Sequence, residues 1–211
     1  MNNLYVVSGF SGSGKGTILL ESLKDKENIY YSVSETTRIP RNKTDRYVFV
    51  TDSVFKERAR RGYYLESNTY GTGKYYGTPL DIVNLNLRNQ KNVLLEIDRC
   101  GYEQVKRHRF IDNVNVRSLF VVVDADTLYE RLMKRDGAEN DQQEIYKRLK
   151  IALDEADYIS QYDCILDNSG SVKEAVKKLD AFYNGKKHID DFNCEKFKTR
   201  ILEILKELSY E

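Results

Sequence analysis

Short apolar runs alternate along the chain with segments whose apolar residues recur at helical spacing. The apolar runs have the length of buried strands, and they are Leu4–Ser8, Val93–Ile97, Leu119–Val123 and the shorter Cys164–Leu166. The helical patterns lie at Ile18–Leu23, Ser53–Arg61, Pro79–Asn89, Thr127–Lys134, Gln143–Asp157 and Val172–Tyr183. Because strands that alternate with helices favour a mostly parallel sheet with helices on both faces, the pattern predicts an α/β fold.

The stretch from about 34 to 78 has a different texture, rich in Tyr, Arg and Thr. Its short strand-like pieces, Tyr47–Val50 and Tyr63–Leu65, predict a small and partly antiparallel lobe inserted between the first two units of the sheet. The polar residues 136–142 lie between two helical patterns and predict a lid over about 131–148.

The chain after residue 184 forms a separate region of the pattern. A linker is followed by an amphipathic helix at about Glu195–Leu208. We therefore expect one domain over 1–184, with its core at 1–33 and 79–184, and a helical extension over 185–211.

Composition narrows the class of protein. A chain of 211 residues is long enough for one domain with a real core. Charged residues make up 32% but nearly cancel to a formal net charge of +1, so no general basic field favours nucleic acid or an anionic membrane. The longest apolar runs are too short to span a bilayer. We expect small-molecule partners.

The cysteines and the N-terminus bear on location. Cys100, Cys164 and Cys194 are far apart in sequence and show no metal-binding spacing, which favours reduced thiols. The N-terminal residues enter an apolar strand with no basic segment before it, so no signal peptide is indicated. A cytoplasmic protein is expected.

A glycine-rich loop stands between the first predicted strand and the first predicted helix. Glycines let the backbone wrap closely around an anion, and successive N–H groups at a helix N-terminus point at it. The residues predicted to bind ATP are Gly9, Ser11, Gly12, Ser13, Gly14, Lys15, Gly16 and Thr17. The alternative, a plain glycine-rich turn with a solvated lysine, does not account for the flanking strand and helix. The loop therefore predicts a P-loop NTPase-type fold that binds a nucleoside triphosphate.

The residue directly after Lys15 bears on the expected metal site. The strict loop pattern has Ser or Thr there, with its hydroxyl on Mg²⁺, whereas this chain has Gly16 and then Thr17. Asp98 ends an apolar strand, and ligand groups gather at the carboxyl ends of strands in such folds. Mg²⁺ is thus expected as cofactor, held by Thr17 and Asp98 directly or through water.

Several further motifs occur in a fixed order downstream of the loop. They are Ser32–Arg41, Tyr47–Val50, Tyr64–Glu66, Tyr75–Thr78, Leu95–Asp98, Glu130–Arg135 and Lys147–Leu149. With these motifs the chain resembles the guanylate kinases over about residues 4–184. The resemblance implies a P-loop nucleoside monophosphate kinase of purine metabolism that transfers a phosphoryl group from ATP to GMP.

The resemblance also implies which residues bind the acceptor. Ser34, Glu66 and Thr78 would read the guanine edge, since a carboxylate can accept from N1–H and the exocyclic amine while hydroxyls donate to O6. Adenine presents the opposite pattern. The residues implied to hold the monophosphate or line the acceptor side are Arg38, Arg41, Tyr47, Tyr76, Glu96 and Asp98. Glu96 stands where the family has aspartate.

Cations gather in these motifs although the whole chain is almost neutral. The six are Lys15, Arg38, Arg41, Arg131, Arg135 and Arg148. Arg131 and Arg135 are four apart on a predicted helix and so share a face. Closing the lid would bring them and Arg148 onto the transferring phosphate, so these three are predicted to be catalytic with Lys15.

Some alternatives stay open at the level of sequence. The segment between Arg41 and Tyr47 is short and 67–74 is unusual, which leaves room for a kinase of another nucleotide or of a phosphorylated sugar. A non-catalytic interaction module of the same family is less favoured because Lys15 is kept. The apolar face of the extension, Phe197 to Leu208, fits either a homodimer contact or packing on the chain's own core.

Overall fold

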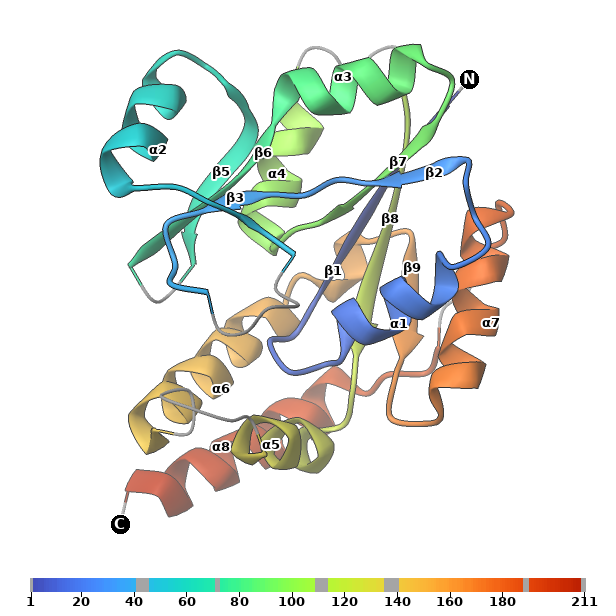
Figure 1. Ribbon diagram of the computed structural model, residues 1–211. Coiled ribbons are helices and arrows are strands. Elements are labelled where there is room, and N and C mark those ends of the chain that lie inside the picture. Colours follow the sequence, from blue (N-terminus) through green and yellow to red (C-terminus); the bar gives the residue numbers. More distant parts are fainter. Residues whose placement is uncertain are drawn as a thin grey trace. The chain divides into compact units, whose positions relative to one another are not determined.

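The computed structural model describes residues 2–40, 46–70, 73–108, 114–134, 141–187 and 190–209 (Figure 1). The chain divides into two compact units. The first comprises Met1–Val7 and Lys26–Arg117, and the second comprises Ser8–Asp25 and Ser118–Glu211.

Three parallel strands form the core of the first unit. β7 (Asn92–Glu96) lies between β2 (Ile29–Tyr31) and β1 (Asn3–Gly9), whose last two residues belong to the second unit. Leu4 pairs with Val93, and both side chains are fully buried. The expected strands at Leu4–Ser8 and Val93–Ile97 are therefore present within one or two residues of the predicted bounds.

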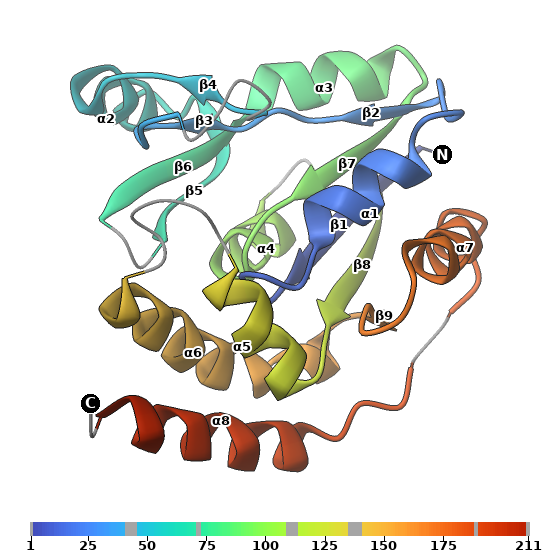
Figure 2. The same ribbon diagram turned by 60° about the horizontal axis from the view of Figure 1, so that its bottom comes forward.

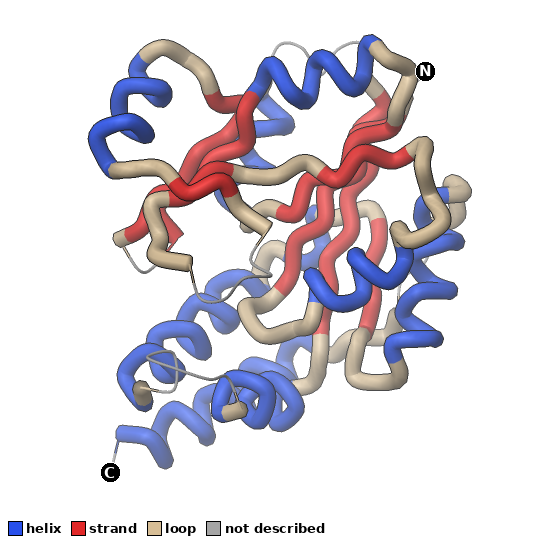
Figure 3. Tube along the Cα trace, viewed as in Figure 1, coloured by secondary structure: helices blue, strands red, loops and turns tan. Residues whose placement is uncertain are grey.

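A small mixed sheet makes up the rest of the first unit (Figure 3). Its order is β4 (Val48–Phe49), β3 (Glu35–Thr36), β6 (Lys74–Pro79) and β5 (Tyr64–Tyr70). Only the β3–β4 pair is parallel among the described pairs of this sheet. The prediction of an inserted and partly antiparallel lobe is confirmed.

Three helices pack on the strands of the first unit. They are α2 (Asp52–Arg60), α3 (Leu80–Arg88) and α4 (Arg99–Arg107), of which α2 and α4 contact β5 and α3 contacts β7. The Thr51 hydroxyl caps α2 by accepting from the Val54 N–H. The Phe55 ring of α2 stacks on Tyr64 of β5 at a centroid distance of 4.5 Å. The lobe thus has an aromatic core of its own.

Buried Glu35 adds a polar tie inside this lobe. Its carboxylate is 4% exposed, pairs with Arg58 of α2 and accepts from the Tyr64 hydroxyl at 2.6 Å. A buried carboxylate without such partners would be strongly destabilising. Glu35 therefore links α2, β3 and β5.

The second unit has two parallel strands and a pair of helices beside them. β8 (Asn115–Val122) pairs with β9 (Cys164–Asp167), and the first three residues of β8 belong to the first unit. α1 (Lys15–Ser22) packs against α7 (Val172–Tyr183). The bounds of α7 are those predicted from sequence. The described strand pairs β1–β7, β2–β7 and β8–β9 are all parallel, as predicted.

The remaining helices of the second unit form a layer that includes the C-terminal extension. α8 (Cys194–Ser209) runs beside α5 (Ala125–Met133) and α6 (Gln142–Ala156), as Figure 2 shows. A single 3₁₀ turn, η3 (Ile159–Gln161), precedes β9. Most of the apolar stripe of α8 is buried within this one chain, namely Phe197, Ile201, Ile204 and Leu205. Packing on the chain's own core thus accounts for the helical spacing of the extension.

Some described elements, among them β2 and α4, were not predicted from sequence. The lid prediction falls partly on residues 135–140, which lie outside the described residues. All three cysteines are free. Within the described ranges no helix combines the length and apolar character needed to cross a bilayer.

Candidate functional site

The phosphate loop leaves β1 at Gly9 and enters α1 at Lys15. Gly12 and Gly14 have φ of 99° and 82°, a left-handed backbone that side chains rarely adopt. A Cβ on Gly9 would lie 2.3 Å from the backbone oxygen of Val121. The Ser13 N–H donates to the Phe10 oxygen at 3.0 Å. The loop is a tight anion-sized turn only because glycine occupies these positions.

Lys15 is the first residue of α1 and lies over the loop. Its Nζ donates to the backbone oxygens of Gly9 at 2.5 Å and Phe10 at 3.0 Å. Gly16 follows, and Thr17 is exposed on the first turn of α1. The ammonium is thus held over the loop whose N–H groups and helix N-terminus would face an anion.

Arg131 of α5 braces the loop together with Asn168, which follows β9. The Arg131 guanidinium donates to the backbone oxygen of Ser13 at 3.0 Å and to the backbone oxygen of Asn168 at 2.9 Å. The Asn168 amide donates to the same Ser13 oxygen at 2.7 Å. A Cβ on Gly14 would lie 2.8 Å from that amide nitrogen. Asn168 was not predicted, because an asparagine 155 residues away from its partner carries no motif.

Arg148 of α6 reaches the loop from another side. Its guanidinium is buried, donates to the Ser11 hydroxyl at 2.5 Å and pairs with Glu144 at 3.2 Å. Of the predicted catalytic residues, Lys15, Arg131 and Arg148 are therefore gathered around one loop in the second unit. Arg135 lies outside the described residues.

The three predicted guanine-reading residues lie together in the first unit. Glu66 of β5 and Thr78 of β6 are direct cross-strand partners, and a β-bulge between Tyr64 and Glu66 shifts the register there. The Thr78 hydroxyl donates to Glu66 Oε1 at 2.6 Å. Its proton is used in that bond, so the Ser34 hydroxyl, 3.2 Å away, donates to Thr78. The result is one chain of hydrogen bonds from Ser34 to Glu66.

The environment of Glu66 changes its acidity. The side chain is buried, and this burial raises the pKa of its carboxyl group to about 7. The hydrogen bond from Thr78 acts in the opposite direction, and the negative charge of Asp98 adds to the rise in pKa. Glu66 thus changes its protonation state near neutral pH.

Asp98 lies beside Glu66 and is the N-cap residue of α4. Its Oδ1 accepts from the Gly101 N–H at 2.7 Å and caps the helix, while Oδ2 accepts from the Asn68 amide at 2.8 Å. A Cβ on Gly101 would lie 2.7 Å from Glu66 Oε2. The missed residues Asn68 and Gly101 therefore fix the two carboxylates.

The predicted phosphate-holding residues also meet in the first unit. The Arg38 guanidinium lies over the Tyr47 ring at 5.4 Å, and the rings of Tyr47 and Tyr76 are 5.7 Å apart. Arg41 lies outside the described residues. The described part of the cluster is thus one cation with two hydroxyl-bearing rings.

A hollow lies next to Tyr47. Its lining includes Tyr31, Ser34, Arg46 and Glu96. The Tyr31 hydroxyl donates to Glu96, and burial raises the pKa of Tyr31, which keeps it a donor. Arg46 lies over the Tyr31 ring at 4.9 Å. Glu96 is therefore held in place on the same hollow as Ser34.

The residues proposed for Mg²⁺ fit that ion by donor chemistry. The Thr17 hydroxyl is solvent-exposed, and each Asp98 oxygen keeps a second lone pair beyond its hydrogen bond. Hydroxyl and carboxylate oxygens, with water, are ligands that Mg²⁺ prefers.

Comparisons with known proteins agree with one another. A family model described as guanylate kinase matches residues 1–185. A guanylate kinase of Clostridium perfringens (strain SM101 / Type A) is 37% identical over 204 residues, which cover 95% of this chain and 89% of that protein. One of Clostridioides difficile (strain 630) is 35% identical and covers 97% and 96% of the two chains. The crystal structure of guanylate kinase from Anaplasma phagocytophilum has a TM-score of 0.64 at 24% identity, covers 92% and 88%, and shows the same fold.

Proposed function

Because the chain belongs to the guanylate kinase family, it is a nucleoside monophosphate kinase, and we propose that its two groups of residues divide the phosphorylation of GMP to GDP by ATP. The phosphate loop of the second unit binds the donor, and the small sheet of the first unit binds the acceptor. The observation that carries the proposal is the hydrogen-bonded chain from half-buried Ser34 through buried Thr78 to buried Glu66, whose groups match a guanine edge.

At the donor site the loop N–H groups hold the phosphates of ATP. Lys15 leaves the two loop oxygens that it contacts and turns to the outer phosphates. Arg131 and Arg148 already lie against the loop through Ser13 and Ser11. Arg135 is proposed to join them when the lid closes.

At the acceptor site Glu66 selects guanine. The ionised carboxylate accepts from N1–H and the exocyclic amine, and the hydroxyls of Thr78 and Ser34 turn to donate to O6. Adenine offers an acceptor at N1, which would leave the buried carboxylate of Glu66 unpaired, and such a mismatch is heavily penalised.

The monophosphate of GMP is proposed to lie between arginine and tyrosine side chains. Arg38 and Arg41 supply forked donors, and Tyr47 and Tyr76 supply hydroxyls. Glu96 and Asp98 border this site. Each is held by a neighbour, Tyr31 and Asn68 respectively.

The reaction needs positioning more than covalent catalysis by the protein. An oxygen of the GMP phosphate attacks the γ-phosphorus of ATP, the bond from that phosphorus to the β-phosphate oxygen breaks, and ADP leaves with the electron pair. Lys15 and the lid arginines stabilise the charge on the transferring group and exclude water. Mg²⁺ bound with ATP offsets phosphate charge, and Thr17 and Asp98 are proposed to hold it directly or through water.

A kinase of another nucleotide or of a phosphorylated sugar is the remaining alternative. Such acceptors lack the adjacent N1–H and exocyclic amine of guanine, the pair of donors from which the buried Glu66 carboxylate is proposed to accept. The guanine-reading chain therefore favours GMP.

The proposal is tested first at Lys15. We expect Lys15→Ala to lower the rate of GDP formation at least a hundredfold, because the removed charge acts on the transferring phosphate. Lys24→Ala, at an exposed lysine just after α1, is the matched control and should keep wild-type activity. Both variants should be folded by circular dichroism. A folded Lys15→Ala enzyme with wild-type turnover would refute the donor site.

A further inference from the structure

The C-terminal extension contacts the phosphate loop through aromatic rings. Phe197 of α8 stacks on Phe10 with a centroid distance of 4.6 Å and an interplanar angle of 4°. On another side of Phe10, the ring of Phe120 meets it edge-on at 5.2 Å. Phe10 is fully buried and Phe197 is 3% exposed. Phe197 lies beyond residues 1–185, the part of the chain that the family model matches.

Phe10 carries the backbone oxygen on which the loop closes. That oxygen accepts from the Ser13 N–H at 3.0 Å and from Lys15 Nζ at 3.0 Å. The residue that α8 supports is therefore the one that sets the turn and receives the loop lysine. A shift of Phe10 moves both.

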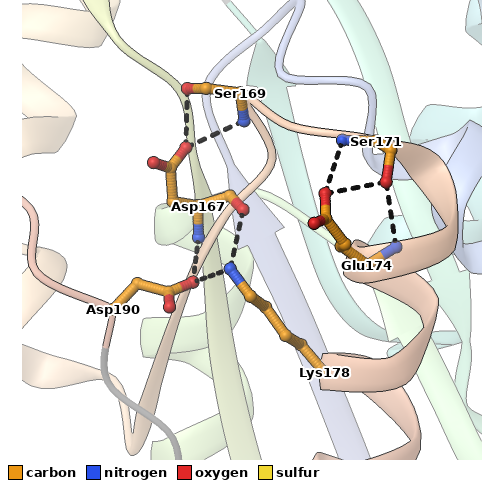
Figure 4. Close-up of polar contacts among 6 residues, drawn as sticks. All are labelled: Asp167, Ser169, Ser171, Glu174, Lys178 and Asp190. Atoms are coloured by element: carbon orange, nitrogen blue, oxygen red, sulfur yellow. Dashed lines mark hydrogen bonds and ion pairs between the residues drawn. The ribbon is translucent and has the colours of Figure 1, made fainter.

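The linker that precedes α8 is held by hydrogen bonds and an ion pair at Asp190. Asp190 Oδ2 accepts from the Asp167 N–H and from Lys178 Nζ, each at 2.7 Å, and so ties the linker to β9 and α7 (Figure 4). The Asp190 N–H also donates to the Ile165 oxygen at 3.1 Å. Phe192 then lies 5.4 Å from Phe197, ring to ring.

Two ion pairs fix α8 itself over neighbouring helices. Lys198 pairs with Asp157 at the end of α6, and Arg200 Nε lies 2.8 Å from Asp126 of α5. Both pairs lie within three residues of Phe197, whose ring is itself buried and stacked. Because interiors are close-packed, a ring held in this way transmits its position to the ring stacked on it.

We propose that Phe197 is a positioning residue of the donor site and that it acts through Phe10 on the phosphate loop and Lys15. The inference rests on the proposed donor site. In the absence of the Phe197 ring a space opens behind Phe10, the loop relaxes into it, and the N–H groups no longer converge on the phosphates of ATP. Donor affinity falls while the acceptor site keeps its affinity.

The test uses the full chain and measures donor binding without turnover. Mg²⁺–ADP is titrated calorimetrically into wild type and Phe197→Ala, and KM for ATP and for GMP is measured for both. The Kd for ADP and the KM for ATP should rise about tenfold in Phe197→Ala, the size expected if the loss of an aromatic pair is coupled to binding. The KM for GMP should stay within about twofold.

A matched control separates positioning from general destabilisation. Ile204 lies on the same face of α8, two turns further on, and is 1% exposed, but it has no ring to stack on Phe10. Ile204→Ala should lower the melting temperature yet leave the Kd for ADP unchanged. Phe197→Leu keeps an apolar side chain of similar volume and decides the question if Phe197→Ala does not fold. We expect its affinity for ADP to be two- to threefold lower than that of the wild type.

Two results overturn the inference: wild-type ADP affinity in the Phe197 variants, or an equal loss in Ile204→Ala. A failure of the proposed function would look different. The wild-type protein would then give no GDP from GMP, whatever its affinity for ADP.

Discussion

Glu66, the residue proposed to read guanine, would set both the selectivity for GMP and the pH dependence of its binding. The residue is 5% exposed, and its carboxyl group accepts from the Thr78 hydroxyl and has a pKa that burial raises to about 7. In the proposed acceptor site guanine presents hydrogen-bond donors to Glu66, so only the ionised carboxylate is complementary. Below pH 7 most Glu66 side chains are protonated. The O–H of the carboxylic acid would then face the N–H groups of guanine, and two hydrogen-bond donors cannot pair. The affinity for GMP is therefore linked to this one titration.

We predict that GMP binds more tightly as pH rises from 6 to 8. The ionised fraction of Glu66 grows about tenfold over that range for a pKa of 7, and the Kd for GMP should fall by a similar factor. The measurement is calorimetric titration of GMP without ATP at several pH values. Glu66→Gln is the control, since it keeps only the smaller change that comes from the phosphate of GMP itself. Equal pH profiles for both proteins would contradict the assignment.

At the scale of elements, the contact between α4 and β5 determines where Glu66 can lie. Asp98 is the N-cap residue of α4, and Gly101 in the first turn of the helix leaves the space that Glu66 Oε2 occupies. Alanine usually stabilises a helix by about 1 kcal/mol relative to glycine. Here the added methyl would meet a carboxylate oxygen at 2.7 Å.

Gly101→Ala should therefore weaken GMP selectivity rather than simply stabilise α4. We expect the ratio of kcat/KM for GMP to that for AMP to fall at least tenfold, because Glu66 must move away from Thr78. Cys100→Ala, one residue earlier in the same helix, is the control and should keep the ratio. If the ratio is unchanged in Gly101→Ala, Glu66 does not read the base.

The helices and strands differ in how well the sequence predicts them. Buried strands such as β1 and β7, and α7 with its capping box, have apolar patterns or end signals that are local. α4 was missed because its segment contains a glycine and is mostly polar, and its stability comes from the Asp98 cap and from packing on β5. β2 and β3 have three and two residues and exist only through their partner strands.

Residues of the candidate site also differ in whether the sequence around them carries a recognisable signal. Lys15, Glu66 and Thr78 were predicted from sequence because they sit in ordered motifs. Asn168 and Asn68 were missed because their roles depend on contacts across 155 and 30 residues, and an isolated asparagine gives no signal in one sequence. The folded chain is needed to see which polar side chains position the motif residues.

At the scale of the whole molecule, the two substrates are proposed to bind groups that belong to different compact units. The phosphate loop, Arg131 and Arg148 belong to the second unit, and Glu66 with its partners belongs to the first. The whole chain has a net charge of only +1. Affinity for each nucleotide therefore comes from local groups and not from a general field.

Thermal unfolding should separate the two sites. A ligand at about 100 times its Kd stabilises the folded state by about 2.7 kcal/mol, or roughly 5–10 °C for a protein of this size. We expect Mg²⁺–ADP and GMP each to raise the melting temperature of the wild type. In Lys15→Ala most of the rise in melting temperature with Mg²⁺–ADP should be lost while the rise with GMP is kept. In Glu66→Ala the rise with GMP should be lost while the rise with Mg²⁺–ADP is kept. A variant that loses both shifts equally would argue against two independent sites.

The acceptor preference of the wild-type enzyme tests the central claim most directly. ADP release is followed in a coupled assay with ATP and, in turn, GMP, dGMP, AMP, UMP, CMP and ribose phosphates. Glu66 and Thr78 predict that kcat/KM is highest for a guanine nucleotide and at least a hundredfold lower for AMP. A preference for AMP, a pyrimidine nucleotide or a ribose phosphate would contradict the proposed guanine-reading role of Ser34, Thr78 and Glu66.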